Sequence, residues 1–550
     1  MNRQTDRLQK ATEYGTIIGF IISLLPILWV SQYVYPQADD FGFGLKTHLA
    51  WVDTHSLWQV LKAAFDTSVY YWGDWQGTYT SSFLMSLQPG IFGENWYHLV
   101  PAIILTLLTL CMFCLFKVVL HDCMNAPWRL TFAITALALL VTIQNVKDQT
   151  ESFTWYNAAI HYTGMQALWM LYLGVLISML RRTRENDGRR AYALYLVAMQ
   201  ILPCLLAFLV GGGNNITVLW AVLVNVSALL LLAGIHIHDL HGSGIHLRTI
   251  RGFERANFHY VMKKHPAGRF FILMLPSSLI LFAGAALNLM SVGNQNRLNF
   301  IGGSHNDIFS TILKSFAAGA HYSVSWMNGG VLLYLLWLIP MAFRLYDGLG
   351  IGREGMRLYS YQPLAASSAS ADGFRFPLPG IVLLYSYCLM SALFAPNLYT
   401  SGAADMLRTQ NGIFYVYILL LTLNVIYFTG WIRMKDFRLI RRAAEKIQEH
   451  GGIAAMAGLL VTTAVCLYML FQNPVCFTSS SAAVTSINGN GQAYAALVEY
   501  NFAQLRDESQ KDVRVKHITV QPSILYSGEI DWWKAGTVSY YRKNSVEWEE

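Results

Sequence analysis

Two adjacent carboxylates, Asp39 and Asp40, follow directly after the first long apolar run of this chain. A carboxylate facing hydrocarbon is costly, so we expect the pair to face an aqueous site. There it could act as a general base on a hydroxyl nucleophile or bind a cation. A solvated turn or a helix cap is the alternative. Glu151 is a further candidate: a second acid, a metal ligand or a partner for Arg297.

Two arginines stand out in loops that otherwise carry few basic residues. Arg297 and Arg408 are nearly the only arginines in the loops that we assign below to the outer side of a membrane. A guanidinium group binds phosphate through two parallel hydrogen bonds, so the pair predicts a lipid headgroup or a lipid-linked phosphate as ligand. A salt bridge or an ordinary headgroup contact is the alternative. Lys46 and Asn294 are candidate further contacts to the same phosphate.

Residues that suit a sugar ring occur in the same set of loops. They are Trp75, Trp155, His161, Asn214 and Asn215. Aromatic rings offer a flat face for the sugar, and the glycines at 211–213 allow backbone N–H groups to approach an anion closely. A plain tight turn explains the glycine run equally. The run lacks the Lys-Ser/Thr end of a nucleotide P-loop.

The composition places the chain in a membrane. Of 550 residues, 54% are hydrophobic and only 13% are charged, whereas soluble domains are about 25% charged. The net charge of +7 does not predict a nucleic-acid partner, because the basic residues cluster in short loops between apolar runs. The seven cysteines lie mostly in or beside those runs, so no disulfide framework is predicted.

Apolar runs of about 20 residues predict an all-α polytopic membrane protein with about eleven transmembrane helices. The candidate spans are 15–34, 98–118, 129–146, 160–180, 191–210, 215–235, 270–290, 325–343, 378–395, 412–432 and 453–472. The N-terminus and alternate loops carry 26 Lys and Arg residues, against six in the opposite loops of the bundle. Because positive loops stay inside, the N-terminus is predicted to be cytoplasmic and residues 473–550 extracytoplasmic.

Two segments outside the spans are expected to fold. The first outer loop, 35–97, contains apolar residues at helical spacing: Leu57, Leu61, Phe65, Val69 and Trp72. They predict an amphipathic helix that lies in the membrane interface or packs on the bundle. The chain is expected to divide into a transmembrane domain, 1–472, and a small outer α+β element, 473–550. It has a linker at 478–491, a helix at 494–506 and a strand at 513–520.

These groups suit one reaction, the transfer of a sugar from a polyprenyl phosphate to a hydroxyl group. Phosphate is a good leaving group that needs cations to hold it, and the weakly nucleophilic acceptor needs a carboxylate base. The alternatives are a solute or lipid-linked oligosaccharide transporter or flippase, and a polymerase or ligase of the O-antigen type. Transporters place charges near the bilayer midplane and often show repeats, neither of which is visible here.

Short motifs along most of the chain resemble the GT-C superfamily of polytopic membrane glycosyltransferases, and within it the bacterial DUF6056 group. They are Asp39-Asp40-Phe41, Trp75-Gln76-Gly77, Glu151 with Trp155, Gly212 or Gly213 before Asn214, Val292-Gly293-Asn294 with Arg297, and the tail Trp532–Tyr541 with its pair of tyrosines. Two positions depart from the usual pattern. Val292 stands where proline is expected, and Thr78 follows Gly77 where arginine is expected.

The resemblance implies a GT-C-like fold, an extracytoplasmic active site in a bacterial inner membrane and an inverting hexosyl or pentosyl transfer. Asp39 or Asp40 would be the base, and Arg297 with Arg408 would hold the donor phosphate. No cofactor is indicated by the residues themselves, although some relatives use a divalent metal, Mg²⁺ or Mn²⁺. The implied partners are a polyprenyl-phosphate sugar donor, an envelope glycan acceptor, membrane lipids, a donor-synthesising enzyme and a flippase.

Overall fold

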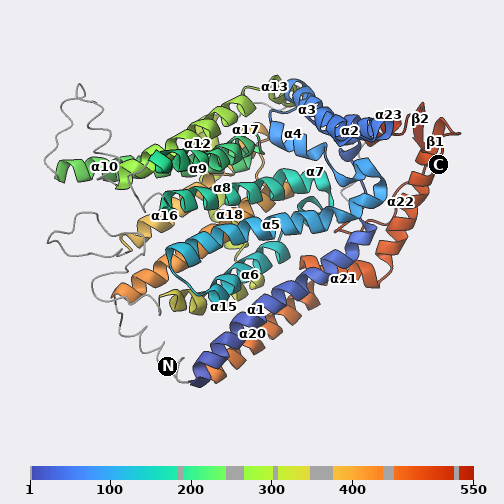
Figure 1. The fold of residues 1–550 in the computed structure, drawn as a ribbon. Helices are drawn as coiled ribbons and strands as arrows, with labels where there is room; N and C mark the ends of the chain where they lie inside the picture. The colour runs from blue at the N-terminus through green and yellow to red at the C-terminus, as the bar shows by residue number, and fades with distance from the viewer. Residues whose placement is uncertain are drawn as a thin grey trace, which may run out of the picture.

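A bundle of long helices running side by side dominates the computed structural model (Figure 1). It describes residues 3–182, 190–242, 266–300, 307–346, 376–435, 437, 451–525 and 532–549. The bundle helices are α1 (Arg3–Val30), α5 (Val100–Phe116), α6 (Trp128–Gln144), α8 (Met165–Arg182), α9 (Arg190–Gly211), α10 (Asn215–Gly242), α12 (Pro266–Leu289), α15 (Gly329–Leu345), α16 (Pro379–Ala392), α18 (Leu407–Lys435) and α20 (Gly451–Gln472).

Within the described ranges, eight helices are long and apolar enough to cross a membrane. A ninth span arises if α14 (Ile308–Ser325) and α15, which meet at a 77° bend, count together. Helix α6 and residues 197–211 are shorter apolar helices. In hydrocarbon no water is present, so the backbone N–H and C=O groups must form hydrogen bonds with one another. This is why apolar runs form helices. The chain is therefore an all-α polytopic membrane protein. Each predicted run overlaps a helix, although 325–343 begins at the bend between α14 and α15. The span count of eleven and the orientation stay predictions.

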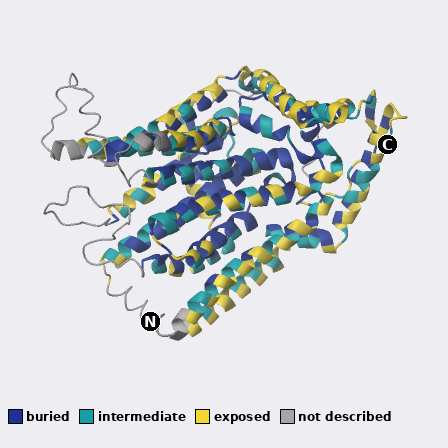
Figure 2. Ribbon diagram, in the orientation of Figure 1, coloured by how far each residue is buried: buried dark blue, intermediate teal, exposed yellow. Residues whose placement is uncertain are grey.

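Helix α18 occupies the interior of the bundle and α20 its edge. Of the residues in the most apolar stretch of α18, 72% are buried, whereas 0% of those in the most apolar stretch of α20 are buried. Figure 2 shows buried residues along the middle helices and exposed ones along α1 and α20. Helices α9 and α12 approach closely where Gly211 meets Gly284, since a Cβ on Gly211 would lie 3.0 Å from the Gly284 backbone. Small residues permit such contacts between membrane helices.

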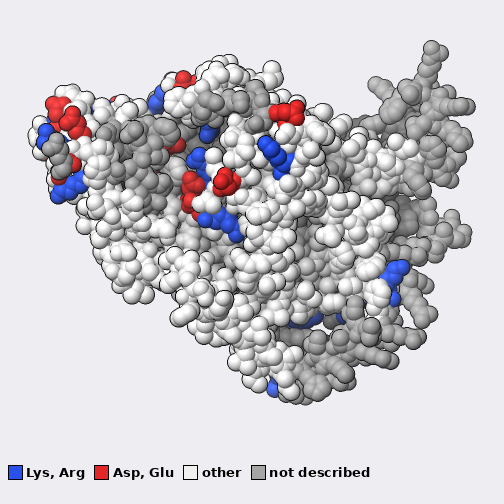
Figure 3. Space-filling model, turned by 180° about the vertical axis from the view of Figure 1, so that it is seen from behind, with Lys and Arg blue, Asp and Glu red and all other residues white. Residues whose placement is uncertain are grey.

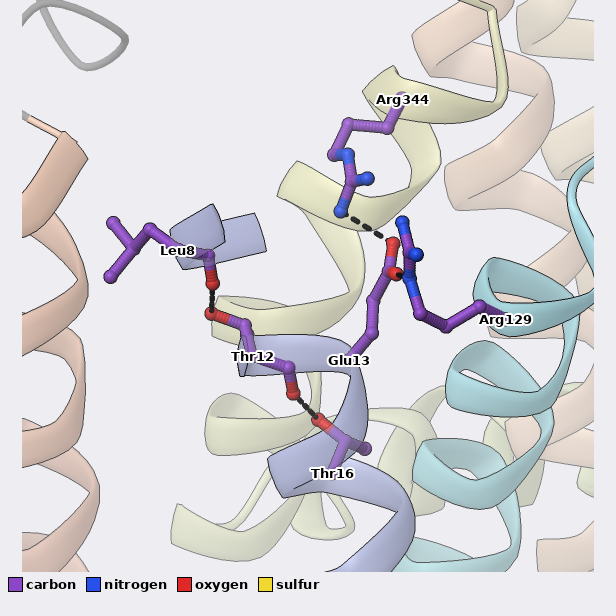
Figure 4. Close-up of polar contacts among 6 residues, drawn as sticks. All are labelled: Leu8, Thr12, Glu13, Thr16, Arg129 and Arg344. Carbon is purple, nitrogen blue, oxygen red and sulfur yellow. Dashed lines mark hydrogen bonds and ion pairs between the residues drawn. The ribbon is translucent and has the colours of Figure 1, made fainter. Parts of the chain in front are cut away.

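A buried carboxylate joins three helices at the end of the bundle that carries the start of α1. Glu13 of α1 is 0% exposed and pairs with Arg129 of α6 and Arg344 of α15 (Figure 4). The Arg344 Nη1 atom lies 2.6 Å from Glu13 Oε1. Two guanidinium groups around one carboxylate compensate the cost of burying its charge. This contact was not predicted, because its members lie far apart along the chain.

The first outer segment folds into three helices and two 3₁₀ turns: α2 (Asp40–Thr54), α3 (Leu57–Asp74), α4 (Tyr79–Met85), η2 (Pro89–Phe92) and η3 (Glu94–Leu99). Helix α3 confirms the predicted helix. Its apolar stripe is exposed, as at Phe65 (63%), whereas Val60, Ala64 and Thr67 face inward. Large apolar side chains outside and small ones inside suit contact with lipid, which favours the interfacial alternative over packing on the bundle.

Helices α13 (Val292–Phe300) and α14 were not predicted, because residues 291–324 were expected to form an outer loop. Helix α13 packs against α3 (Figure 1), and α14 packs against α16 and α17 (Ala395–Thr400). The Asp307 carboxylate accepts a 2.7 Å hydrogen bond from the Ser310 N–H and so caps α14. Like α3, α14 buries small residues such as Ser315 and Gly319 and exposes large ones such as Phe309, at 70%.

The tail folds into α21 (Thr478–Ile487), α22 (Asn490–Arg506), β1 (Asp512–Val515), α23 (Trp532–Tyr540) and β2 (Ser545–Trp548). The predicted linker at 478–491 is wrong, because its small residues pack helix α21 against α1. The predicted helix is confirmed as α22, and the predicted strand is shorter. Strands β1 and β2 pair in parallel, with Val513 opposite Val546. The tail contacts the outer segment, where the Tyr540 hydroxyl donates to the Gly90 carbonyl at 3.1 Å.

Candidate functional site

Asp39 is positioned by a turn at the start of α2. The preceding residue, Ala38, has a φ of 48°, in the left-handed region that residues with side chains rarely adopt. Ala38 is held there by packing against Trp155 and Ala158, with which it forms a small buried cluster. Asp39, the next residue along the chain, remains half-buried. Trp155 therefore supports the turn beneath the carboxylate.

Asp39 lies within electrostatic reach of both predicted arginines. Its negative charge acts on Arg297 of α13 and on Arg408 of α18, and the two guanidinium groups act on each other. Burial lowers the pKa of Arg297 and the positive charge of Arg408 lowers it further, while the Asp39 charge opposes both. Figure 3 shows acidic and basic side chains gathered on a face that is otherwise mostly uncharged among the residues coloured.

Glu151 pairs with Arg408 rather than with Arg297, the partner considered from the sequence. Its Oε1 atom lies 3.7 Å from Arg408 Nη1, and its side chain is 16% exposed. Burial and the neighbouring Asp148 charge raise the pKa of Glu151 to about 7, against the opposing effect of Arg408. A carboxyl group with this pKa can give or take a proton at neutral pH. We call Asp39, Asp148, Glu151, Arg297 and Arg408 the charged cluster.

Two π-helical turns carry residues of this region. Glu151 lies in η5 (Thr150–Thr154) and His161 in η6 (Ile160–Gly164), on either side of α7 (Tyr156–Ala159). Such turns are rare overall, and those that occur are often found at functional sites. The His161 ring lies within electrostatic reach of both Arg297 and Arg408. Its Nδ1 atom is buried and has no hydrogen-bond partner in the described part of the chain. The structure therefore brings His161 to the charged cluster.

Asp40 has a different environment from its neighbour. It is 0% exposed, and its Oδ2 atom accepts hydrogen bonds from the Tyr97 hydroxyl (2.5 Å) and the Gln37 N–H (3.0 Å). Burial raises the pKa of Asp40 to about 7, although both hydrogen bonds oppose the shift. A carboxylate enclosed in this way joins α2 to η3 and cannot meet an acceptor without a rearrangement. Of the two aspartates, only Asp39 is partly exposed.

Asn294 connects the first outer segment to α13. Its Oδ1 atom accepts from the Gly77 N–H at 2.9 Å, and its Nδ2 donates to the Asn288 carbonyl at 2.7 Å. The glycines around it fit tightly, since a Cβ on Gly293 would lie 2.5 Å from the backbone nitrogen of Trp75. This contact sets Trp75 against Arg297, whose guanidinium carbon lies 5.5 Å from the indole ring. The structure thus gives Asn294 a positioning role.

Asn214 is also occupied by the fold itself. Its Oδ1 atom accepts from the Thr217 N–H at 3.0 Å and caps α10, while its Nδ2 donates to the His161 carbonyl at 2.5 Å. The cap fills the place that an anion would take at the start of α10. Asn215 is exposed at the first position of that helix. Lys46 lies apart on the exposed face of α2, with its ammonium 4.9 Å from the Tyr70 ring.

Within the described ranges, no three His, Cys, Asp or Glu side chains are grouped so that they could hold a metal ion. The carboxylates of the charged cluster face guanidinium groups instead, and Glu151 is the clearest case. These residues therefore do not fit a divalent metal held by protein ligands alone. We derive no step through Mg²⁺ or Mn²⁺.

Two tyrosines of the site were missed by the sequence analysis. Tyr162 lies within electrostatic reach of Arg297, Arg408 and Glu151 of the charged cluster. Its place next to His161 was the one feature that could have suggested it. Tyr97 binds Asp40 at the start of a span, where a tyrosine is ordinarily read as part of the interfacial aromatic belt. Both roles depend on contacts between distant segments.

Comparison of the chain with protein-family models and with curated proteins finds no match in either set. The fold defines its class as a multi-pass, all-α membrane protein. Its candidate site is the partly buried charged cluster, in which Arg297 lies over the ring of Trp75.

Proposed function

We propose that this protein is a membrane glycosyltransferase of the GT-C type. It moves a sugar from a polyprenyl-phosphate donor to a hydroxyl group of an envelope glycan, on the extracytoplasmic face of a bacterial cytoplasmic membrane. The observation that carries the proposal is that the half-buried Asp39 acts on both Arg297 and Arg408. This supports a site in which one carboxylate would act as the base and the two guanidinium groups would bind the phosphate.

In this proposal Asp39 is the base. It accepts the proton of the acceptor hydroxyl as that oxygen bonds to the anomeric carbon of the sugar. The bond from the anomeric carbon to the phosphate oxygen breaks, and its electron pair leaves with the phosphate. Attack from the face opposite the phosphate inverts the configuration. Asp40 is excluded from this role by its burial and by its bonds to Tyr97 and Gln37.

Arg297 and Arg408 hold the phosphate in the ground state and as it gains negative charge. Guanidinium groups remain charged even when partly buried, which suits them to a phosphate beside hydrocarbon. Glu151 sets the position of Arg408 at 3.7 Å. When a phosphate binds Arg408, Glu151 loses part of its electrostatic support, so it becomes easier to protonate. Trp75, 5.5 Å from Arg297, provides a flat face beside the phosphate for the sugar ring.

The test compares the surface glycan of the source organism after deletion of this gene and complementation with variants. Removal of a base costs about 10²–10⁴-fold in rate, so Asp39→Asn is expected to restore none of the missing sugar. Asp66→Asn is the matched control, because Asp66 is an exposed aspartate of α3. All variants must reach the membrane in equal amounts.

Normal sugar content with Asp39→Asn would overturn the base assignment. A deletion that leaves glycan composition unchanged but traps a lipid-linked sugar on the cytoplasmic face would favour a flippase. Arg408→Lys separates charge from geometry, because lysine keeps the charge but cannot form two parallel hydrogen bonds to phosphate. We expect this variant to restore only a fraction of the sugar.

A further inference from the structure

Lys147 is a half-buried cation that the proposed reaction does not use. It lies in the loop between α6 and η5, next to Asp148. Its Nζ atom is 4.2 Å from the centre of the Phe414 ring and 5.4 Å from that of Trp326. Phe414 is 0% and Trp326 3% exposed. The ammonium therefore rests on two aromatic faces that keep water from one side of it, while Lys147 keeps part of its own surface exposed.

The backbone around Lys147 is fixed by one side chain of α18. The Asn411 Oδ1 atom accepts from the N–H groups of Lys147 (2.7 Å) and Asp148 (3.0 Å), and its Nδ2 donates to the Asp148 carbonyl (2.9 Å). The loop also packs against the bend between α14 and α15, where a Cβ on Gly330 would lie 2.2 Å from Asn145 Oδ1. The backbone at Lys147 is therefore held in place, and this sets the direction of the side chain.

The ammonium has no ion-pair partner among the carboxylates of the described residues. Asp148 and Glu151 both act on Arg408 instead. Burial alone lowers the pKa of Lys147, to about 8, with no neighbouring charge contributing. Attraction to aromatic rings offsets only part of the cost of removing an ammonium from water. Because the aromatic rings cover one side of the ammonium, its other side is available to an anion.

We propose that Lys147 binds the phosphate group of an anionic ligand at a second position, deeper along α18 than Arg408. Arg408 and Phe414 are six residues apart on this helix, which is about 9 Å along its axis. A compact ammonium binds phosphate as a point charge. The ligand is a phosphate ester that enters from the lipid side, or free phosphate or diphosphate that enters from water. This inference does not require sugar transfer.

The test uses the purified full-length protein in detergent micelles, with dodecyl phosphate, inorganic phosphate and inorganic pyrophosphate as separate probes. Binding is measured from the rise in Tm with probe concentration. Removal of one partner of a buried charge pair is costly, so Lys147→Gln is expected to weaken binding by about 30-fold or more. Lys147→Arg retains a charge and should keep most of the affinity. Lys62→Gln, on the exposed face of α3, is the matched control and should bind as the wild type does.

A second measurement uses the wild-type protein and so does not depend on the folding of a variant. The Lys147 amine is labelled with an acylating reagent, and the modified peptide is quantified by mass spectrometry. A bound phosphate should protect Lys147 from the reagent while exposed Lys62 still reacts. Protection by dodecyl phosphate alone assigns the ligand to the lipid side, and protection by the inorganic probes assigns it to water.

The two proposals can fail separately. Protection of Lys147 that persists in an Arg408→Gln variant shows a position distinct from the charged cluster, whatever the outcome for sugar transfer. Equal labelling of Lys147 with and without every probe would overturn the inference. So would a Lys147→Gln variant that binds dodecyl phosphate as tightly as the wild type.

Discussion

The Tyr97 hydroxyl donates a 2.5 Å hydrogen bond to Asp40 Oδ2 and accepts one of 2.8 Å from the Tyr156 N–H. One phenol thereby joins the first outer segment to the start of α7, which follows the η5 turn that carries Glu151. The two neighbouring aspartates therefore have different roles. Asp40 holds these segments together inside the protein, and Asp39 remains at the surface of the site.

The Tyr97→Phe variant is expected to lower the free energy of unfolding by about 1–3 kcal/mol, because two buried polar groups lose a partner. Its effect on the Asp40 pKa has a definite sign. The Tyr97 hydrogen bond lowers that pKa against the larger effect of burial, so the variant should raise it further. The unfolding measurement is made in detergent, with Tyr468→Phe as control, since Tyr468 is 65% exposed on α20. Equal losses in both variants would contradict the role of Tyr97.

The stability of the protein should fall as pH rises from about 5 to 8. The folded state holds a proton on Asp40 up to a pKa of about 7, against an ordinary value of 3.8. Between these two pKa values the folded state binds more protons than the unfolded state. The contribution of the Asp40 proton to the free energy of unfolding is therefore present at low pH and is lost as pH passes 7. Glu151, raised from 4.5 to about 7 by burial, acts in the same direction.

The Asp40→Asn variant tests this assignment, since an asparagine at this place cannot titrate. Its Tm should depend less steeply on pH than that of the wild type over the same range. The measurement is a series of thermal unfolding curves at constant ionic strength. Parallel curves for the two proteins would show that Asp40 does not carry the dependence.

The parts of the molecule that were predictable are those set by local chemistry. Hydrocarbon forces an apolar run such as 412–432 into a helix, and the spacing of Leu57 and Phe65 sufficed to predict α3. Contacts between distant segments were not predictable. The electrostatic influence of Asp39 on Arg408, the burial of Asp40 and the capping of α10 by Asn214 depend on packing. Short polar stretches such as 478–491 were misread because small residues suit both linkers and tight helix packing.

The Gly77→Ala variant is expected to lose stability, since its Cβ would lie 1.8 Å from the Asn288 carbonyl oxygen. Overpacking of this kind costs about 1–3 kcal/mol or more. It would also displace the Trp75 region from Arg297. Gly73→Ala is the matched control four residues away, because a Cβ there meets nothing within 4 Å. Alanine is the better helix former, so Gly73→Ala should be neutral or slightly stabilising. Unfolding in detergent measures both, and equal effects would contradict the close contact.

Helix α14 should lie at the membrane interface with its large apolar residues toward the lipid. A fluorophore on a cysteine at Phe309 (70% exposed) or Ile312 (47% exposed) is expected to be quenched by lipids that carry a quencher on the acyl chain. A fluorophore at Asp66, on the polar face of α3, should be quenched less. The measurement is made in proteoliposomes. Equal quenching at Phe309 and Asp66 would place the outward face of α14 in water.

The Glu13→Gln variant should destabilise the end of the bundle opposite the charged cluster. Glu13 is 0% exposed and compensates two guanidinium groups, those of Arg129 and Arg344 (Figure 4). Removal of one partner from a buried ion pair costs about 3–5 kcal/mol, because the remaining charge stays buried. Asp53→Asn is the control, since the Asp53–Arg542 pair is more than half exposed on both sides and such pairs contribute little. Because α1, α6 and α15 are joined at Glu13, its loss should also increase proteolysis at that end. Unchanged unfolding and unchanged proteolysis would show that the three helices are held by apolar packing alone.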